Sequence, residues 1–168
     1  MLQDQVQKFA QKSIAPLVRQ MGTDGKIPTQ LVSQFFEQEL MGIEISTEQG
    51  GAGMSFFSSC LAIEELAKVD ASVAVCVDVQ NTLVNNAVRR FGNPDIQKQF
   101  LPRLATDTVG SFCLSESGSG SDAFALKTTA KQDGDYYVLN GSKSWITNAG
   151  EAGLFIVLAN IDHSKGYK

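Results

Sequence analysis

The sequence predicts an α+β protein in two parts, an all-helical N-terminal domain followed by a smaller β domain. Roughly the first two-thirds of the chain carry apolar residues at helical spacing, interrupted by capping residues and glycines. After Gly110 the pattern changes to short β-like runs separated by the turn signals Asp133-Gly134 and Asn140-Gly141. Asn-Gly between β runs is a strong hairpin signal. The change of pattern places the domain boundary near residues 106 to 110.

The helical part begins with two short apolar stripes. Pro16 is expected to interrupt the first helix, because proline lacks an N–H group and its ring clashes with the preceding turn. Pro28 suits the first position of the second helix. The apolar residues of the first stripe are Leu2, Val6, Phe9, Ala10, Leu17 and Val18, and those of the second are Leu31, Val32, Phe35, Phe36 and Leu40.

Three further helices are expected before the boundary. Ser55 can cap a helix that carries Leu61, Ile63, Leu66 and Ala67. Residues 70–90 are rich in valine, but their length favours a buried helix over a strand, since strands seldom exceed about ten residues. Asn93 and Pro94 then mark the start of a last helix, as its cap and its first residue.

The β part contains several short strands. "SFCLS" at residues 111–115 is a short apolar strand, and residues 125–149 hold three β-like runs. "AGLFIVLANI" at residues 152–161 predicts a further strand, buried on both faces or nearly so. A sheet of so few strands leaves an unpaired edge, so the chain is expected to be a fragment or to need a partner.

Composition excludes several classes of function. The net charge is -4 and no stretch concentrates Lys or Arg, which argues against nucleic-acid or membrane-surface binding. No apolar run approaches the ~20 residues that span a bilayer. Cys60, Cys76 and Cys113 sit in apolar settings and are expected to be free buried thiols, and with His163 as the single histidine no metal site is predicted.

The stretch "FCLSESGSGSDAFALKT", residues 112–128, has two interpretations. The serines and glycines from Ser117 to Ser121 could form a flexible linker. Alternatively, because glycine permits left-handed backbone, successive N–H groups could converge on a phosphate or a ring cofactor. The stretch lacks the Gly-Lys-Ser/Thr of a phosphate loop, and no helix follows it as a dinucleotide fingerprint requires.

Trp145, in "SWITNAG", is the single tryptophan. It could be an ordinary core aromatic. It could also contact a flat heteroaromatic ring, with the adjacent Thr147 and Asn148 supplying hydrogen bonds. The carboxylates Glu64, Glu65, Glu116 and Asp122 are not accompanied by a Lys or His constellation, so no catalytic base is identified.

These motifs resemble those of the acyl-CoA dehydrogenase family. "CLSESGSGSD" is similar to that family's signature, and "WITNA" is similar to its second flavin motif. The resemblance extends over essentially the whole chain and is greatest to the short/branched-chain members. It implies a helical domain at residues 1–108 and the first part of an antiparallel, barrel-like β domain at residues 109–168, without the family's C-terminal four-helix domain.

The resemblance also implies a set of ligand-binding residues. Ser115 is expected to hydrogen-bond the flavin ring, Trp145 to pack beside it and Thr147 to bond near its reactive nitrogen, while Ser121 and Tyr167 approach the acyl-CoA. Val79 and Leu83 would line the acyl pocket or simply pack in the core. The implied FAD-binding set is Phe112, Cys113, Leu114, Ser115, Glu116, Ser117, Gly118, Ser119, Gly120, Ser121, Trp145, Ile146 and Thr147.

The implied activity is FAD-dependent α,β-dehydrogenation of short or branched acyl-CoA thioesters, with an electron-transfer flavoprotein as acceptor. The family's catalytic glutamate is expected to lie outside this chain, which would then be inactive alone. The resemblance further implies a homotetramer, located in the mitochondrial matrix in a eukaryote. Two alternatives stay open, a non-catalytic short isoform or interaction fragment, and an acyl-CoA oxidase.

Overall fold

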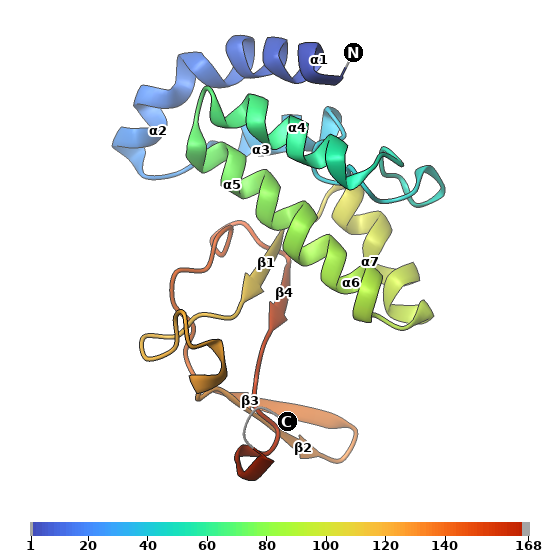
Figure 1. The fold of residues 1–168 in the computed structure, drawn as a ribbon, viewed down its shortest axis with the longest axis vertical. Coiled ribbons are helices and arrows are strands. Elements are labelled where there is room, and N and C mark those ends of the chain that lie inside the picture. Colours follow the sequence, from blue (N-terminus) through green and yellow to red (C-terminus); the bar gives the residue numbers. More distant parts are fainter. Residues whose placement is uncertain (1, 166–168) are drawn as a thin grey trace.

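The computed structural model describes residues 2–165, with a helical part at one end and a β part at the other. Figure 1 shows the N-terminus on the helical end and the end of the described chain beside the hairpin at the far end of the β part. The predicted class, a helical domain followed by a small domain of strands, is confirmed. No helix within residues 2–165 is long and apolar enough to cross a membrane.

The first helical stretch changes its winding around Pro16. Helix α1 (Leu2–Phe9) passes into a π-helical turn, η1 (Ala10–Ile14), and a 3₁₀ turn, η2 (Ala15–Leu17), before α2 (Val18–Asp24). Proline cannot donate the usual hydrogen bond, so the interruption lies where it is expected. The chain then reverses at Gly25, whose left-handed backbone ends α2.

The next helices begin close to the predicted starts. Helix α3 (Thr29–Glu37) starts one residue after Pro28, which occupies the cap position. A loop containing the 3₁₀ turn η3 (Thr47–Gln49) leads to α4 (Phe56–Ala67). The Ser55 hydroxyl accepts a hydrogen bond from the Ser58 N–H at 3.3 Å, which confirms the predicted cap.

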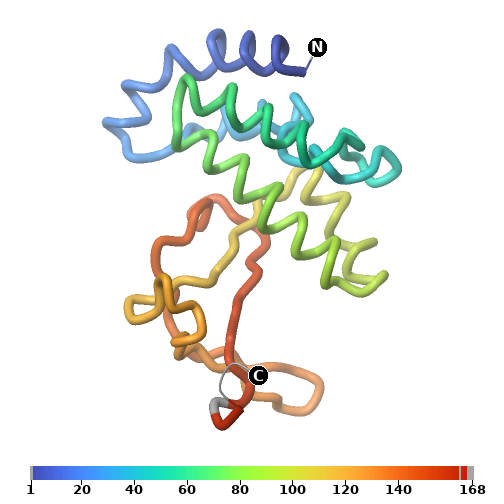
Figure 2. The backbone as a smooth tube through the Cα atoms, viewed as in Figure 1, coloured from blue at the N-terminus to red at the C-terminus, as the bar shows by residue number. Residues whose placement is uncertain are grey.

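Residues 71–91 form one long helical rod that runs diagonally through the molecule (Figure 2). It consists of α5 (Ala71–Asp78), a π-helical segment η4 (Val79–Asn85) and α6 (Asn86–Phe91). The helix is as predicted, but the wide middle segment was not anticipated from the sequence. Helix α7 (Pro94–Thr106) follows, and Asn93 accepts a hydrogen bond from the Ile96 N–H at 2.9 Å as its predicted cap.

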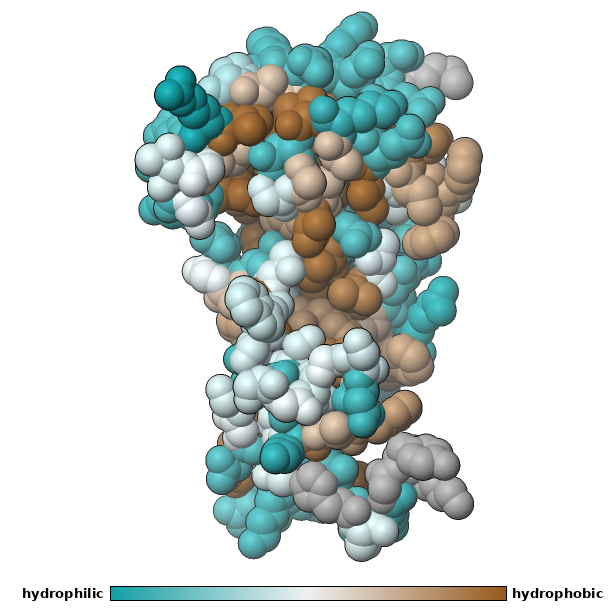
Figure 3. All heavy atoms as spheres, turned by 60° about the vertical axis from the view of Figure 1, so that its left-hand side comes forward, coloured by the Kyte–Doolittle hydropathy of each residue, from teal (hydrophilic) through white to brown (hydrophobic). Residues whose placement is uncertain are grey.

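The helices bury their apolar faces in a core that includes Phe35, Leu31, Leu66 and Val77. Apolar side chains also gather along the middle of one face of the molecule, between hydrophilic ends (Figure 3). Cys76 and Cys113 are buried as expected, whereas Cys60 is exposed. The expectation for Cys60 is wrong because the buried face of α4 consists of Ser59, Ala62, Glu65 and Leu66.

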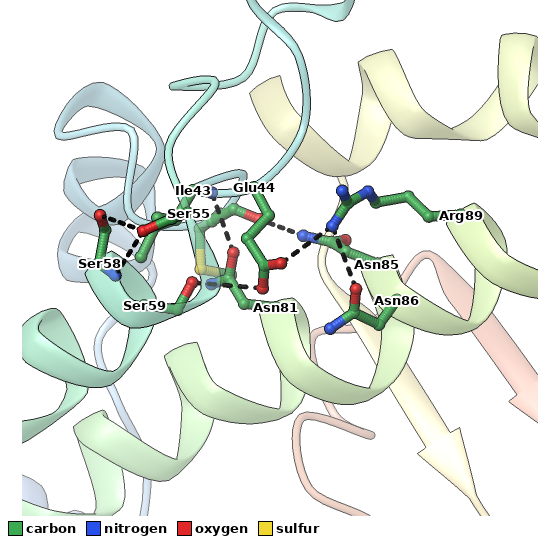
Figure 4. A network of polar contacts seen from close by, with 10 residues as sticks. Ile43, Glu44, Ser55, Ser58, Ser59, Asn81, Asn85, Asn86 and Arg89 are labelled. Carbon is green, nitrogen blue, oxygen red and sulfur yellow. Dashed lines mark hydrogen bonds and ion pairs between the residues drawn. The ribbon is translucent and has the colours of Figure 1, made fainter.

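A row of polar side chains on the long helical rod holds the loop after α3 (Figure 4). Asn81 accepts a hydrogen bond from the Ile43 N–H at 2.9 Å and donates to the Leu40 carbonyl at 2.7 Å. Near the end of the rod, Arg89 forms an ion pair with Glu44 at 3.1 Å. The Asn81 contacts satisfy buried backbone groups that a loop could not pair by itself.

The strands form two small two-stranded sheets within residues 2–165. Strand β2 (Thr129–Asp133) pairs antiparallel with β3 (Tyr136–Asn140), as the Asp133-Gly134 turn signal predicts. By contrast, β1 (Gly110–Cys113) and β4 (Leu154–Val157) pair in parallel, which differs from the expected antiparallel arrangement. The reason is that Gly153 and Leu154 donate to the Val109 carbonyl, so both strands leave the helical domain from the same point.

Two further β expectations are wrong. Residues 142–147 form a loop instead of a third β run. The reason is that the Ser144 N–H bonds to the Ser115 carbonyl, in the segment that follows β1, and not to the hairpin. Strand β4 is not buried on both faces, since Phe155 is half exposed where only one neighbouring strand covers it. Short 3₁₀ turns, η5 (Ala123–Ala125) and η6 (His163–Lys165), complete the part described.

Gln80 joins the two parts of the molecule. Its side chain is fully buried on the long rod. The amide nitrogen donates to the Leu104 carbonyl at 2.9 Å and the Thr108 carbonyl at 3.1 Å, and the amide oxygen accepts from the Gly110 N–H at 2.8 Å. One side chain therefore ties the long rod to the end of α7 and the first residue of β1.

Candidate functional site

The structure brings the two predicted motifs together. The Ser144 N–H donates to the Ser115 carbonyl at 3.0 Å, so the chain before Trp145 lies beside the chain that leaves β1. The Ser111 hydroxyl donates to the Thr147 carbonyl at 2.8 Å. Residues 111–116 and 143–148 thus form one continuous surface, although about thirty positions separate them in sequence.

The segment after Ser115 is a hydrogen-bonded turn. Glu116 and Ser119 exchange backbone hydrogen bonds of 2.9 and 3.1 Å. The Ser119 hydroxyl donates to the Asp122 carbonyl at 2.8 Å, and Ser119 is only 2% exposed. A flexible linker would have neither feature, so the linker interpretation of Ser117–Ser121 is wrong.

The Glu116 carboxylate anchors this turn. It accepts hydrogen bonds from the Lys127 N–H at 2.7 Å, the Thr128 N–H at 2.9 Å and the Thr128 hydroxyl. The Lys143 ammonium forms an ion pair with it at 2.8 Å, with both side chains about nine-tenths buried. Bonding to Lys143, then to Thr128 and Lys127, holds the pKa of Glu116 well below its usual range.

The expectation that no lysine accompanies Glu116 is therefore wrong. Lys143 lies 27 positions further along the chain, which is why a search for neighbouring charges missed it. The sequence feature that could have pointed to Lys143 is its position two residues before Trp145. The Glu116 side chain is occupied by the protein itself, so any contact from this residue to a cofactor would come from its backbone.

Acid is expected to weaken this anchor. Because the pKa of Glu116 is lower in the folded than in the unfolded protein, its stabilising contribution is complete above the unfolded value of about 4.3 and is lost as pH falls below it. The free energy of unfolding of Glu116→Gln, measured with urea, should therefore approach that of the unmodified protein as pH falls from 5 to 3. If the difference in the free energy of unfolding between the two proteins stayed constant over that interval, the Glu116 charge would not stabilise the fold.

Trp145 projects from this surface into solvent. Its side chain is 95% exposed, which contradicts the core interpretation. Its backbone has φ 60°, in the left-handed region that non-glycine residues rarely adopt. Held by the Ser144 hydrogen bond on one side and the Thr147 carbonyl bond on the other, the indole is available as a flat apolar contact surface.

The two motifs also carry hydroxyl groups that the described part of the chain leaves unbonded. Within residues 2–165, the hydroxyls of Ser115, Ser121 and Thr147 form no hydrogen bond to another protein group. An exposed apolar plane and unbonded hydroxyls on the same two motifs fit a ring that has polar atoms at its edge, as a flavin has. Unlike these hydroxyls, the Cys113 side chain is buried, and burial raises the pKa of its thiol.

The other expected ligand residues lie away from the indole. Phe112 lines an apolar groove of about 610 Å³ with Phe91, Ile96, Ile156 and other residues. On the long rod, Val79 is buried, whereas Leu83 is 40% exposed. Tyr167 lies outside the described residues. Residues 2–165 contain no group of three or more His, Cys, Asp or Glu side chains that could hold a metal ion.

A second groove, of about 380 Å³, separates the loop 146–151 from the helical domain. Cys76 lines it on the side of α5, and Ile146, Thr147 and Asn148 line it on the side of the loop. Burial raises the pKa of the Cys76 thiol to about 12, and the nearby Glu151 adds to the shift. This thiol is therefore protonated at neutral pH and serves as a packing group.

The comparisons with known proteins agree with these motifs. A family model described as the acyl-CoA dehydrogenase N-terminal domain matches residues 1–108, and one described as the middle domain of that family matches residues 111–168. The mitochondrial short/branched chain specific acyl-CoA dehydrogenase of Bos taurus is 54% identical over 168 residues. That match covers 100% of this chain and 39% of the bovine protein.

Solved structures show the same similarity. Butyryl-CoA dehydrogenase from Megasphaera elsdenii has 34% identity and a TM-score of 0.90, covering 98% of this chain and 45% of that one. Glutaryl-CoA dehydrogenase from Mycobacterium smegmatis in complex with FADH2 has 31% identity and a TM-score of 0.90. That match covers 96% of this chain and 42% of the mycobacterial chain. The chain spans less than half the length of these proteins, and it belongs to the acyl-CoA dehydrogenase family.

Proposed function

We propose that the full-length gene product is an FAD-dependent acyl-CoA dehydrogenase that acts on short and 2-methyl-branched acyl-CoA thioesters. The observation that carries this proposal is the fully exposed Trp145 beside the hydrogen-bonded turn at residues 116–119. The identity of 54% to a short/branched chain specific enzyme supports the substrate class, and the glutaryl-CoA dehydrogenase complex with FADH2 supports the cofactor.

FAD, when bound, supplies the acceptor for the hydride that leaves the β-carbon of the thioester. The chain's own residues bind and orient it. Trp145 would pack beside the ring, and the Ser115 and Thr147 hydroxyls would donate hydrogen bonds to its polar atoms. The remaining residues of the expected set, Phe112–Ser121 and Ile146, supply backbone and packing contacts around the ring.

The acyl-CoA is proposed to lie between this surface and the long helical rod. Ser121 would approach the acyl-CoA, and Val79 and Leu83 would limit the space for the acyl chain. This proposal takes no base from residues 2–165, because the family resemblance implies a catalytic glutamate outside this chain; here Glu116 is committed to Lys143 and Thr128, and Lys68 pairs with Glu64 and Glu65. Proton removal from the α-carbon is therefore assigned to a residue outside this range.

The proposal includes the partners that the family resemblance implies. The full-length protein would pass electrons to an electron-transfer flavoprotein, assemble as a homotetramer and act in the mitochondrial matrix of a eukaryote. The bovine relative is a mitochondrial protein, which supports the location. Turnover with oxygen as the sole acceptor would instead identify an acyl-CoA oxidase.

Replacing Trp145 is the direct test of the flavin site. In the full-length protein, Trp145→Ala should weaken FAD binding roughly tenfold, because one aromatic contact surface is lost. Its free energy of unfolding without FAD should stay within about 0.5 kcal/mol, since the exposed side chain packs against little of the protein. Flavin absorbance after titration of the apoprotein measures the first quantity, and urea unfolding measures the second.

Tyr136→Ala is the matched control, since Tyr136 is an aromatic residue, 78% exposed, on the distant hairpin. It should leave FAD affinity unchanged. Trp145 is the single tryptophan of these 168 residues, so tryptophan fluorescence that FAD quenches in the unmodified protein and not in Trp145→Ala would report contact directly. A full-length protein that gains no flavin absorbance would overturn the proposal, and one that binds FAD without oxidising acyl-CoA would favour a non-catalytic isoform.

A further inference from the structure

Asn148 occupies an unusual place in the loop that carries Trp145. Its backbone has φ 67°, so both Trp145 and Asn148 adopt the left-handed conformation within four consecutive residues. Asparagine tolerates this conformation better than most residues other than glycine. The identity of residue 148 thus helps to set the path of the chain on both sides of Thr147.

The Asn148 side chain connects this loop to two other elements. Its amide nitrogen donates to the Cys76 carbonyl of α5 at 3.2 Å and to the Gly110 carbonyl of β1 at 3.3 Å. The groove of about 380 Å³ lies between the loop and α5. Side-chain packing across this gap is therefore incomplete, and the amide spans it.

The element that Asn148 contacts is the one proposed to face the acyl chain. Cys76 lies one helical turn before Val79, and Leu83 follows one turn later on the same rod. At the other end of the connection, Asn148 is adjacent to Thr147 and three residues from Trp145. A single side chain therefore links the expected flavin surface to the expected substrate wall.

We propose that Asn148 is a positioning residue, which sets the distance and angle between the Trp145–Thr147 surface and the α5–η4 rod. This inference rests on the proposed function, because it assumes that FAD lies on that surface. Asn148 does not touch reacting atoms. It acts through the loop that it holds, and misplacement of about 1 Å in an active site is enough to slow a reaction up to a hundredfold.

Two substitutions distinguish the role of the backbone conformation of residue 148 from the role of its side-chain amide. Asn148→Gly keeps a residue that adopts positive φ freely but removes both side-chain hydrogen bonds. Asn148→Asp keeps the shape but places carboxylate oxygens against the carbonyls of Cys76 and Gly110. In the full-length enzyme both should lower kcat roughly tenfold, with KM for the acyl-CoA changed less, because alignment is lost while the binding groups remain.

The decisive readout is the visible absorption spectrum of the bound flavin, which depends on the contacts around the ring. We expect its bands to shift in Asn148→Gly. A purely structural role would lower the free energy of unfolding and leave the spectrum and kcat of the folded enzyme unchanged, and that result would overturn the inference. If Asn148→Asp does not fold, Asn148→Gly decides the question.

Glu39→Gly is the matched control. Glu39 is another non-glycine residue in the left-handed region, with φ 57°, and it is exposed in the helical domain. It should leave the flavin spectrum and kcat unchanged. An unmodified protein that binds no flavin would overturn the proposed function and this inference with it, whereas an unmodified flavoprotein whose Asn148→Gly variant has the same spectrum and kcat would overturn only the positioning role.

Discussion

Lys143→Met is expected to weaken FAD binding by the full-length protein roughly tenfold or more, a loss comparable to one charged hydrogen bond. The Lys143 ammonium bonds both the Glu116 carboxylate at 2.8 Å and the Leu114 carbonyl at 3.0 Å. Methionine fills similar volume but donates nothing, so a largely buried carboxylate is left without its cation. Titration of the apoprotein with FAD, followed by flavin absorbance, measures the effect.

Three variants test whether the pair is responsible. Lys143→Arg should retain most of the affinity, because it keeps a cation beside Glu116. The double variant Lys143→Met with Glu116→Gln should bind FAD better than the two separate losses predict, because the unpaired charge is gone. Lys131→Met, on the exposed face of the hairpin, serves as the control for removing a lysine. Equal losses in Lys143→Met and Lys131→Met would exclude an anchoring role.

Gln80→Ala is expected to lower the free energy of unfolding by about 3 kcal/mol, because three buried backbone groups lose their partner. The groups are the carbonyls of Leu104 and Thr108 and the N–H of Gly110. They lie at the junction of the two domains, so the loss should also make the joint between them less rigid. Urea unfolding of the apoprotein gives the stability, and hydrogen exchange of the Gly110 amide shows whether the junction opens.

The control for this prediction is Gln132→Ala. Gln132 also donates a side-chain hydrogen bond, to the Gly134 carbonyl at 3.2 Å, but it lies on the exposed hairpin. Its replacement should change the free energy of unfolding by less than about 0.5 kcal/mol. If Gln80→Ala lowered the free energy of unfolding by no more than that, water would be bonding the backbone groups that Gln80 had paired. The junction would then not depend on Gln80.

Local signals in the sequence predicted much of the helical domain. Ser55 and Asn93 act within three residues of their own positions, so their caps are visible from neighbouring residues. Pro16 acts on the turn that contains it, and the length of residues 70–90 was enough to choose helix over strand. The π-helical segment within that rod was missed, because the choice between α and π winding depends on how the whole helix packs.

The sequence by itself also determined the two motifs that identify the family, since "CLSESGSGSD" and "WITNA" are continuous stretches. It did not reveal what each side chain in them does. Glu116 was expected to contact the cofactor, yet its carboxylate is occupied by Lys143 and Thr128. Trp145 could have been a core residue until its 95% exposure excluded that interpretation.

Only the tertiary structure decided the features that depend on segments far apart in the chain. The Glu116–Lys143 pair spans 27 positions, the Asn148 bond to Cys76 spans 72, and β1 and β4 pair in parallel across an intervening hairpin. The physical reason is the same in each case. Caps and turns bring together groups a few residues apart, whereas these contacts form only when the tertiary fold places segments that are far apart in sequence within hydrogen-bonding distance.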